Sequence, residues 1–204
     1  MDPLAIGFEP EARGSIDVAL HARRAEEIKG DLVVLRRAKG ILHLTGFELE
    51  REVVRFLNDE LGIRARHESG NREDFWLLDD ASGEEWCLGE VKAAESRTIE
   101  RPELSKVDSH RREAGRAPDF PALLVASTFR GREVVDRRDE AIPPNIISRA
   151  AEDHILIVRT LDLIRMKQKA LMGNDEAARL TSEIRAGSGW FKVDADLSIA
   201  VDRG

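Results

Sequence analysis

Two short apolar runs flank a polar segment between residues 74 and 92. The polar segment, residues 79–85, contains a glycine, as the longer loop of a β-hairpin commonly does. With this loop centred on Ser82, the residues that face each other are Leu78 with Trp86, Trp76 with Leu88, and Asp74 with Glu90. The pattern therefore predicts a hairpin that brings the carboxylates of Asp74 and Glu90 to opposed positions.

A helical pattern of apolar positions precedes the hairpin. Thr45 and Glu48 have the spacing of a capping box, in which Thr45 begins the helix and Glu48 reaches back to it. The apolar stripe of this helix comprises Val53, Val54, Leu57 and Leu61, and its polar face comprises Glu48, Glu52, Arg55 and Asp59. We expect the helix to run to about Leu61 and to stop at Gly62.

Glu50 is the acidic residue of this helix that lies in register with the apolar stripe, one turn before Val53 and Val54. A carboxylate on a buried face is costly unless it is paired or bound to a metal. The alternative is a boundary position in the first turn, where the helix macrodipole favours an acid. The sequence leaves both interpretations open.

The remaining apolar segments alternate between strand and helix patterns. Further strands are predicted at residues 63–68, 120–126, 155–158 and 190–193. Further helices are predicted at residues 15–30, 32–44, 102–114, 143–153, 161–172 and 175–186. We expect an arginine-rich loop at residues 129–138 and a frayed acidic end after residue 193.

This order of elements predicts an α/β fold. Its central mixed sheet has the order helix, three strands, helix, strand, is flanked by helices, and carries helical additions at both ends. We divide the chain into an N-terminal appendage for dimerisation or docking (1–44), a central domain (45–173), and a C-terminal helix and tail (174–204).

Composition narrows the class of protein. The 204 residues are 42% hydrophobic and 35% charged, which favours a packed core over global disorder. A single cysteine excludes a disulfide framework and a cysteine-based zinc site. The chain has no signal-type start and no apolar run of about 18 residues, so we expect a soluble, cytoplasmic protein.

Charge and histidine spacing add two expectations. The net charge of −7 argues against a general nucleic-acid binder, although it allows a local basic groove. The histidines show neither HxH nor HExxH spacing, and we expect each of them at the surface or at a helix end. They are His21, His43, His67, His110 and His154.

The hairpin supplies the candidate chemistry. Side chains alternate along a strand, so Lys92 shares a face with Glu90. Two acids and a lysine on one patch of sheet are costly unless a cation lies between the acids, which predicts a metal site. The alternative is that Asp74 and Glu90 are ordinary solvated charges at strand ends.

The chain resembles the PD-(D/E)XK nuclease superfamily, the restriction-endonuclease-like phosphodiesterases, over roughly residues 45–172. The matching segments are Gly46-Phe-Glu-Leu-Glu50, Leu61-Gly62, Glu73-Asp74 and Gly89-Glu-Val-Lys92, together with the later strands at 122–125 and 155–158. Two positions depart from the pattern of this superfamily. Glu73 replaces the proline of the first motif, and Lys106 stands where glutamine is frequent.

The resemblance implies that Asp74 and Glu90 hold Mg²⁺ or Mn²⁺ through oxygen ligands, with Glu50 completing the metal shell directly or through water. Lys92 would orient or deprotonate the attacking water. The residues expected to contact nucleic-acid phosphates are Lys106, Arg111, Arg112, Arg130 and Arg132.

We therefore expect a metal-dependent endonuclease that acts on DNA, with RNA as a less favoured substrate, in a bacterial restriction or defence context. We also expect a homodimer, and a protein partner could supply specificity or activation. A second hypothesis is a catalytically inactive nuclease-like fold that serves as a binding or dimerisation module. A third is a structural adaptor that uses residues 1–44 as its contact surface.

Overall fold

The computed structural model describes residues 21–26, 29, 32–33, 36, 39–68, 73–137, 141–171, 176–186 and 188–204. The chain divides into two units, Met1–Arg37 and Ala38–Gly204. The described residues of the first unit are helical, whereas the start of the helix predicted at residues 15–30 lies outside the described part. Ile41 and Leu42, which the sequence assigned to the appendage, are buried in the core of the second unit.

Seven strands within the described residues form one sheet, ordered as in the chain. They are β1 Ala65–His67, β2 Phe75–Leu78, β3 Glu85–Ala93, β4 Ala122–Ser127, β5 Ile155–Arg159, β6 Gly189–Val193 and β7 Ile199–Asp202. Neighbours from β1 to β3 are antiparallel, neighbours from β3 to β6 are parallel, and β7 is antiparallel to β6. The predicted mixed sheet is confirmed.

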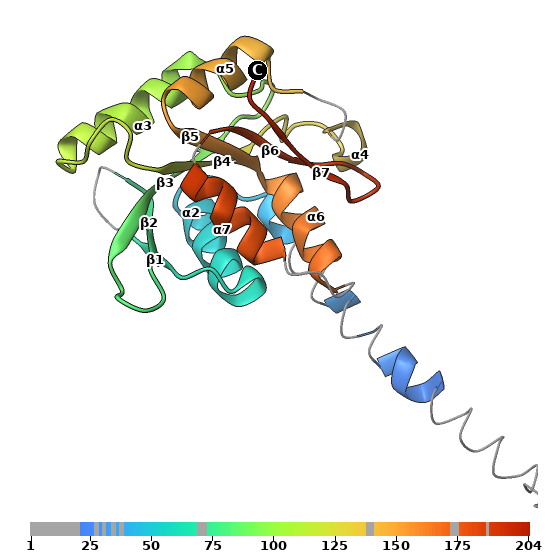
Figure 1. Cartoon of the computed structure of the whole chain (residues 1–204). Helices are drawn as coiled ribbons and strands as arrows, with labels where there is room; N and C mark the ends of the chain where they lie inside the picture. Colours follow the sequence, from blue (N-terminus) through green and yellow to red (C-terminus); the bar gives the residue numbers. More distant parts are fainter. Residues whose placement is uncertain are drawn as a thin grey trace, which may run out of the picture. The chain divides into compact units, whose positions relative to one another are not determined.

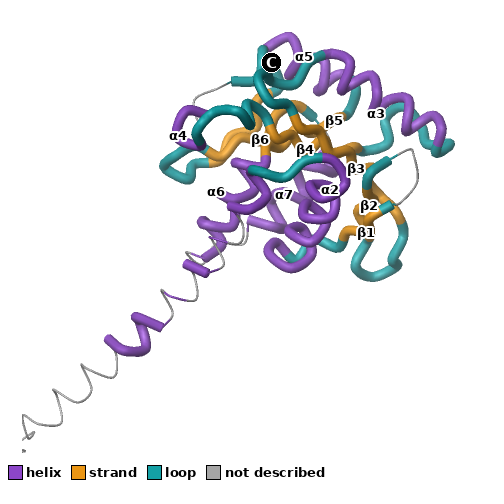
Figure 2. Tube along the Cα trace, turned by 180° about the vertical axis from the view of Figure 1, so that it is seen from behind, coloured by secondary structure: helices purple, strands orange, loops and turns teal. Residues whose placement is uncertain are grey.

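Helices cover both faces of the sheet. They are α2 Gly46–Arg55, α3 Arg101–Glu113, α4 Val134–Arg137, α5 Pro144–Glu152, α6 Thr160–Leu171 and α7 Glu176–Ala186, with the short turns η1 Gly40–Leu42 and η2 Phe56–Glu60. Helices α2, α6 and α7 lie on one face, and α3 and α5 lie on the other (Figure 1). Figure 2 shows the same three layers from behind. The α/β class with helices on both faces is therefore confirmed.

Alternation along the strands separates two hydrophobic cores. On β3, Cys87 and Val91 belong to the core beneath α2, whereas Leu88 belongs to the core beneath α3. Glu90 and Lys92 have the parity of Leu88, so they face α3. Trp76 of β2, the partner of Leu88, also belongs to the core beneath α3. Glu90 and Lys92 thus project toward the same helix.

The hairpin register agrees with the prediction except next to the loop. Trp76 pairs with Leu88 as predicted, but Leu78 pairs with Glu85 rather than Trp86 because the register shifts after Leu77. This irregularity lies at the loop end of the hairpin, and the pairing continues to Phe75 with Gly89 at the other end.

Gly89 allows the two strands of the hairpin to pack closely. A Cβ atom at this position would lie 2.2 Å from Cε2 of Phe75, so a larger residue would displace the aromatic ring. The absence of a side chain at Gly89 therefore lets Phe75 cover the backbone beside Glu90.

The helix predicted from Thr45 forms, but its ends differ in detail from the prediction. Thr45 is the N-cap residue, yet its side chain makes no capping hydrogen bond within the described residues, so the predicted capping box with Glu48 is wrong. The final turn widens into a π-helical segment, Phe56–Glu60, before Gly62. The predicted apolar stripe is confirmed, since Val53, Val54, Leu57 and Leu61 are all buried.

Three further differences concern segments after β3. A capping box forms at α3 instead, between Glu100 and Glu103. The arginine-rich segment contains the short helix α4, where only a loop was expected. The acidic end is not frayed within the described residues: Ile199–Asp202 forms the edge strand β7 and pairs with β6.

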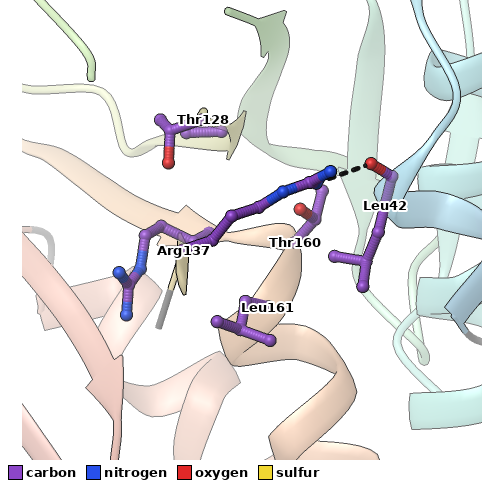
Figure 3. A pocket seen from close by; sticks show the side chains of 7 residues that line it. Leu42, Thr128, Arg137, Thr160 and Leu161 are labelled. Carbon is purple, nitrogen blue, oxygen red and sulfur yellow. Dashed lines mark hydrogen bonds between the residues drawn. The ribbon is translucent and has the colours of Figure 1, made fainter. Parts of the chain in front are cut away.

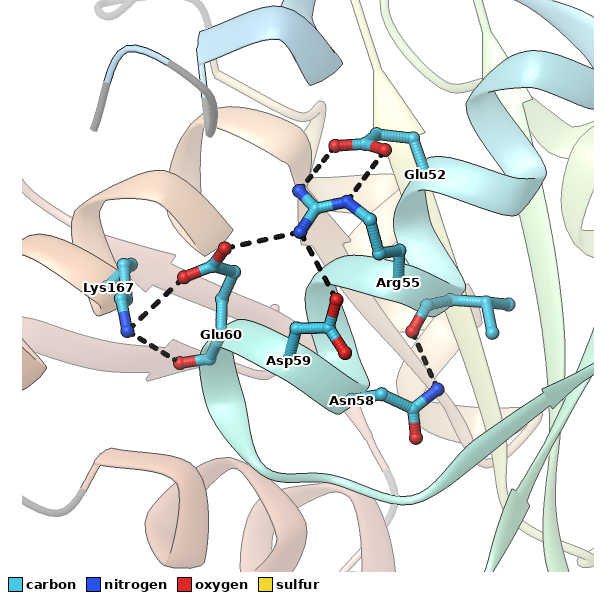
Figure 4. A network of polar contacts seen from close by, with 7 residues as sticks. Glu52, Arg55, Asn58, Asp59, Glu60 and Lys167 are labelled. Carbon is cyan, nitrogen blue, oxygen red and sulfur yellow. Dashed lines mark hydrogen bonds and ion pairs between the residues drawn. The ribbon is translucent and has the colours of Figure 1, made fainter. Parts of the chain in front are cut away.

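A polar network holds α2 and η2 against the rest of the domain (Figure 4). Arg55 donates to Glu52 at 2.8 Å and to Glu60 at 3.2 Å, and Lys167 of α6 donates to the Glu60 backbone carbonyl at 3.1 Å. Asn58 bonds the backbone of Ala65 in β1 in both directions, at 2.8 and 3.0 Å. These contacts fix the helix that carries Glu50 relative to the hairpin.

A buried ion pair connects helix α6 to the strands at the other end of the sheet. Asp162 of α6 is fully buried and accepts hydrogen bonds from Arg159 Nε at 2.9 Å and from Trp190 Nε1 at 3.2 Å. It also accepts from the backbone N–H of Arg159 at 3.1 Å and of Val193 at 3.2 Å. The guanidinium of Arg159 lies over the Trp190 ring, 4.6 Å from its centroid. Asp162 therefore joins α6 to β5 and β6.

Candidate active site

Asp74 directly precedes β2 and Glu90 lies in β3, the two strands of the hairpin. The register of β2 with β3 ends at Phe75 and Gly89, and the backbone N–H of Asp74 also donates to the carbonyl of Gly89, at 3.1 Å. The backbone N–H of Val91 donates to Asp74 Oδ2 at 2.7 Å, so the carboxylate turns toward β3. Asp74 therefore lies beside the Gly89–Val91 segment, close enough to Glu90 for that carboxylate to raise its pKa.

Glu90 is fully buried between the sheet and α3, and basic groups surround its carboxylate. Lys92 Nζ contacts Oε1, and Lys106 Nζ lies 2.9 Å from the same oxygen. The other oxygen, Oε2, lies 2.9 Å from Nδ1 of His110. Burial lowers the pKa of Lys106, but the contact with Glu90 outweighs it and raises the net pKa. Lys106 therefore remains charged beside Glu90.

The electrostatic environment of Asp74 differs from that of Glu90. Burial raises the pKa of Asp74 to about 6, and the neighbouring Glu90 carboxylate raises it in the same direction. The hydrogen bond from Val91 and the charge of Lys92 act in the opposite direction, and Glu50 adds to the increase. Burial is thus the main reason for the raised pKa of Asp74, and the neighbouring acids add to it.

Glu50 joins this site from α2. Its carboxylate is partly buried and lies 3.6 Å from Nε2 of His67 in β1. It borders a cleft of about 280 Å³ that Lys92 and Arg130 also line. Nε of Arg130 is buried and has no hydrogen-bond partner within the described part of the chain. The cleft therefore brings together an acid from α2, the lysine of β3 and an arginine from the loop after β4.

The carboxylate oxygens of this site are suitable ligands for a divalent cation. Carboxylate oxygens are the ligands that Mg²⁺ and Mn²⁺ prefer, and a cation beside Asp74 would relieve the repulsion that raises its pKa. The arrangement is not a preformed cage, because no three His, Cys, Asp or Glu side chains of the described residues converge closely enough to hold a metal. Asp74 and Glu90, with Glu50 nearby, are the residues that would hold the ion.

The residues expected to contact phosphates occupy very different environments. Arg111 is fully buried and donates to the backbone carbonyls of Asp153 at 2.5 Å and His154 at 2.7 Å, so its assignment to a nucleic-acid surface is wrong. Its guanidinium ties α3 to the turn before β5. The ammonium group of Lys106 forms an ion pair with Glu90.

The other three arginines lie nearer the surface. Arg112 is exposed on α3 and donates to Ser109 Oγ at 3.3 Å. Arg132 lies over the ring of Phe129, 4.7 Å from its centroid. Arg130 borders the same cleft as Lys92 and Glu50, which makes it the best placed of the three.

His110 is the residue of this site that the sequence analysis missed. It lies in the last turn of α3, at a helix end as expected, but it is buried there and contacts Glu90. The available signal was its spacing from Lys106: residues four apart share a helix face, so both could reach the same carboxylate. Glu73, at the position of the missing proline, is also buried and accepts from Trp76 Nε1 at 2.9 Å.

A second cavity lies away from these residues and has a structural role. It measures about 10 Å³ and is lined by Arg137, Thr160 and Leu161, among others (Figure 3). This volume is enough for one water molecule at most. Arg137 Nη1 donates to the Leu42 carbonyl at 2.9 Å, and its Nη2 donates to the Arg130 carbonyl at 2.6 Å. Arg137 thus anchors the loop that carries Arg130 to η1.

Replacing Asp74 by asparagine is expected to stabilise the protein in EDTA at neutral pH. The unfolded pKa is about 3.9, so between about pH 4 and pH 6 the folded state keeps a proton that the unfolded state releases. Stability of the wild type therefore falls as pH rises through this window. We expect Asp74→Asn to raise the free energy of unfolding by about 1–2 kcal/mol at pH 7 and to change it little at pH 4.

Urea unfolding with EDTA at the two pH values measures this difference. The asparagine oxygen can still accept from Val91, so the variant keeps that hydrogen bond. Equal stability of variant and wild type at pH 7 would show that Asp74 is not crowded by negative charge.

No helix within the described residues is both long and apolar enough to cross a membrane.

Comparisons with known proteins add no relative to this description. The chain matches neither a protein-family model, nor a curated protein, nor a solved structure. The function must therefore be inferred from the geometry of Asp74, Glu90, Lys92 and Glu50.

Proposed function

We propose that the protein is a metal-dependent endonuclease that hydrolyses phosphodiester bonds of DNA on a restriction-endonuclease-like core. The observation that carries this proposal is the carboxylate of Asp74 held against the backbone of β3 at Val91, next to Glu90, with Lys92 in contact with Glu90. The order of one helix, three strands, a helix and a strand within a mixed sheet supports it.

The residues divide the chemistry between them. Asp74 and Glu90 would bind Mg²⁺ or Mn²⁺, with Glu50 as a further oxygen donor beside the cleft. Such a cation supplies charge neutralisation and a lower pKa of bound water. Lys92 would hold the attacking water and stabilise negative charge as it develops on the phosphate. Arg130 would bind a backbone phosphate from the rim of the same cleft.

The substrate and assembly follow from weaker indications. We propose DNA rather than RNA, with sequence choice left to loops or to a protein partner. Because the net charge is −7, binding would depend on the local cations of the cleft rather than on a general basic surface. A homodimer would supply two cuts of opposite polarity on a duplex.

Plasmid cleavage tests the proposed function directly. The protein is incubated with supercoiled DNA and Mg²⁺ or Mn²⁺, and an EDTA sample serves as the control. Metal-dependent nicking or linearisation that disappears in Asp74→Asn supports the proposal. Equal cleavage by wild type and Asp74→Asn would point to a contaminating nuclease and remove the support.

Glu50→Gln and Glu48→Gln form a matched pair on α2. We expect Glu50→Gln to reduce cleavage and to leave stability near or above that of the wild type, because it removes an acid close to Asp74. Glu48 is exposed and its predicted capping box is not formed, so Glu48→Gln should change the free energy of unfolding by less than about 0.5 kcal/mol and spare activity. Cleavage assays and thermal melts compare the two, and loss of activity in Glu48→Gln alone would contradict the proposed role of Glu50.

A second candidate function rests on a different observation. Lys92, Lys106 and His110 already surround the carboxylate of Glu90, as partners of a purely structural carboxylate would. This favours an inactive nuclease-like module that binds nucleic acid or protein without cutting. DNA binding without metal dependence and without cleavage would support this second candidate.

A further inference from the structure

Lys106 occupies the position beside Glu90 that a bound cation would need. Its Nζ lies 2.9 Å from Oε1 of the fully buried Glu90, and the Asp74 carboxylate is also close enough to raise the pKa of Lys106. An ammonium group and a divalent cation repel each other strongly at such distances when water is largely excluded. They therefore compete for the same carboxylate oxygen.

The two lysines that contact Glu90 differ in how easily their ammonium groups can move away from the carboxylate. The Lys92 side chain is 24% exposed and extends from a central strand. The Lys106 side chain is 46% exposed and extends from α3, a helix on the surface of the domain. Its flexible four-carbon stem can move the ammonium into water, where the charge is solvated again. Lys106 is thus the cation that can be displaced at low cost.

The remaining contacts keep Glu90 in place when Lys106 moves. Lys92 contacts the same oxygen, and His110 lies beside the other oxygen from within the buried face of α3. The carboxylate therefore stays oriented toward Asp74 whether Lys106 is present or absent. Exchange of one cation for another does not require the hairpin or α3 to rearrange.

We propose that Lys106 is a displaceable counter-ion that occupies the divalent-cation position beside Glu90 and leaves when the metal binds. This inference rests on the proposed function, because it assumes that Asp74 and Glu90 bind a divalent cation. Its consequence is that the protein weakens its own metal affinity. The site fills only when the cation concentration is high enough to displace Lys106.

Titration of the full chain with Mn²⁺ by calorimetry tests this inference without an activity measurement. Lys106→Met removes the charge but keeps an unbranched side chain, and Lys106→Gln keeps a polar group that can still donate to Glu90. We expect both variants to bind Mn²⁺ about tenfold more tightly or better than the wild type. Lys106→Arg keeps the positive charge and should gain nothing. Arg112→Met, on an exposed position of the same helix, is the matched control and should also gain nothing.

Thermal melts give a second readout that is independent of catalysis. In EDTA, Lys106→Met should melt below the wild type, because Glu90 loses one of its counter-ions. Saturating Mn²⁺ should raise the melting temperature of the variant more than that of the wild type. A merely structural lysine would produce the first effect without the second.

The outcomes separate this inference from the proposed function. Equal Mn²⁺ affinity of the wild type, Lys106→Met and Lys106→Gln overturns the role of Lys106, while metal-dependent cleavage by the wild type leaves the nuclease proposal intact. If none of these proteins binds Mn²⁺ and the wild type does not cut DNA, both proposals fail. Tighter binding in Lys106→Met and Lys106→Gln, with Lys106→Arg unchanged, supports the counter-ion.

Discussion

Replacing Lys92 by alanine is expected to reduce DNA cleavage by roughly a hundred- to a thousand-fold, the typical effect of removing one preorganised electrostatic element at a reaction centre. Lys92 contacts Glu90 and lines the cleft that Glu50 and Arg130 also border. In the proposed mechanism this charge acts on the attacking water and on the phosphate. Because this charge acts mainly in the transition state, the rate should fall far more than the affinity for DNA.

The fold should survive the Lys92→Ala substitution. Lys106 still pairs with Glu90 after Lys92 is lost, and His110 still contacts its other oxygen, so the carboxylate is not left as an unpaired buried charge. Mn²⁺ should bind at least as tightly as in the wild type, because a repelling cation has gone. Single-turnover plasmid cutting and Mn²⁺ titration on both proteins separate the chemical step from binding.

Lys192→Ala is the matched control for Lys92→Ala. Lys192 also lies on a strand, but it pairs with Asp194 at 2.6 Å near the opposite edge of the sheet. This variant should cut DNA at the wild-type rate. If Lys92→Ala retained full activity, the proposed mechanism would be wrong even if the protein proved to be a nuclease.

Replacing Asp162 by alanine is expected to destabilise the protein by about 3–5 kcal/mol, the usual cost of removing one partner of a buried ion pair. The substitution leaves the buried guanidinium of Arg159 without its carboxylate. It also leaves the N–H groups of Trp190 and Val193 without the acceptor that they use in the wild type. The contacts between α6, β5 and β6 should weaken together.

Urea unfolding measures the cost of Asp162→Ala, with Asp194→Ala as the control. Asp194 forms an ion pair at the surface, so its loss should cost at most about 1 kcal/mol. Adding Arg159→Met to the Asp162→Ala variant removes the uncompensated cation and should recover part of the stability. A loss no larger than that of Asp194→Ala would show that Asp162 does not hold these elements together.

The local elements around the site could be predicted from the sequence because they depend on residues that are close together in the chain. The spacing of Val53, Val54, Leu57 and Leu61 predicted the buried face of α2, and all four are buried. The alternation around residues 79–85 predicted that Trp76 pairs with Leu88, which the structure confirms. The irregularity at Leu78 did not disturb this pair, because it lies at the loop end. The periodicity of a strand or helix decides which residues share a face.

The partners of these residues were decided by packing between distant segments. Whether Glu90 is solvated or buried depends on α3, which brings Lys106 and His110 onto it from 16 and 20 residues away. The same docking buries Arg111 against the carbonyls of Asp153 and His154, although its sequence context resembles that of an exposed arginine. Likewise, the acidic C-terminal segment becomes β7 only because β6 offers it a free edge. Periodicity assigns a residue to a face, but only the tertiary structure brings a second element against that face and so determines its burial and charge environment.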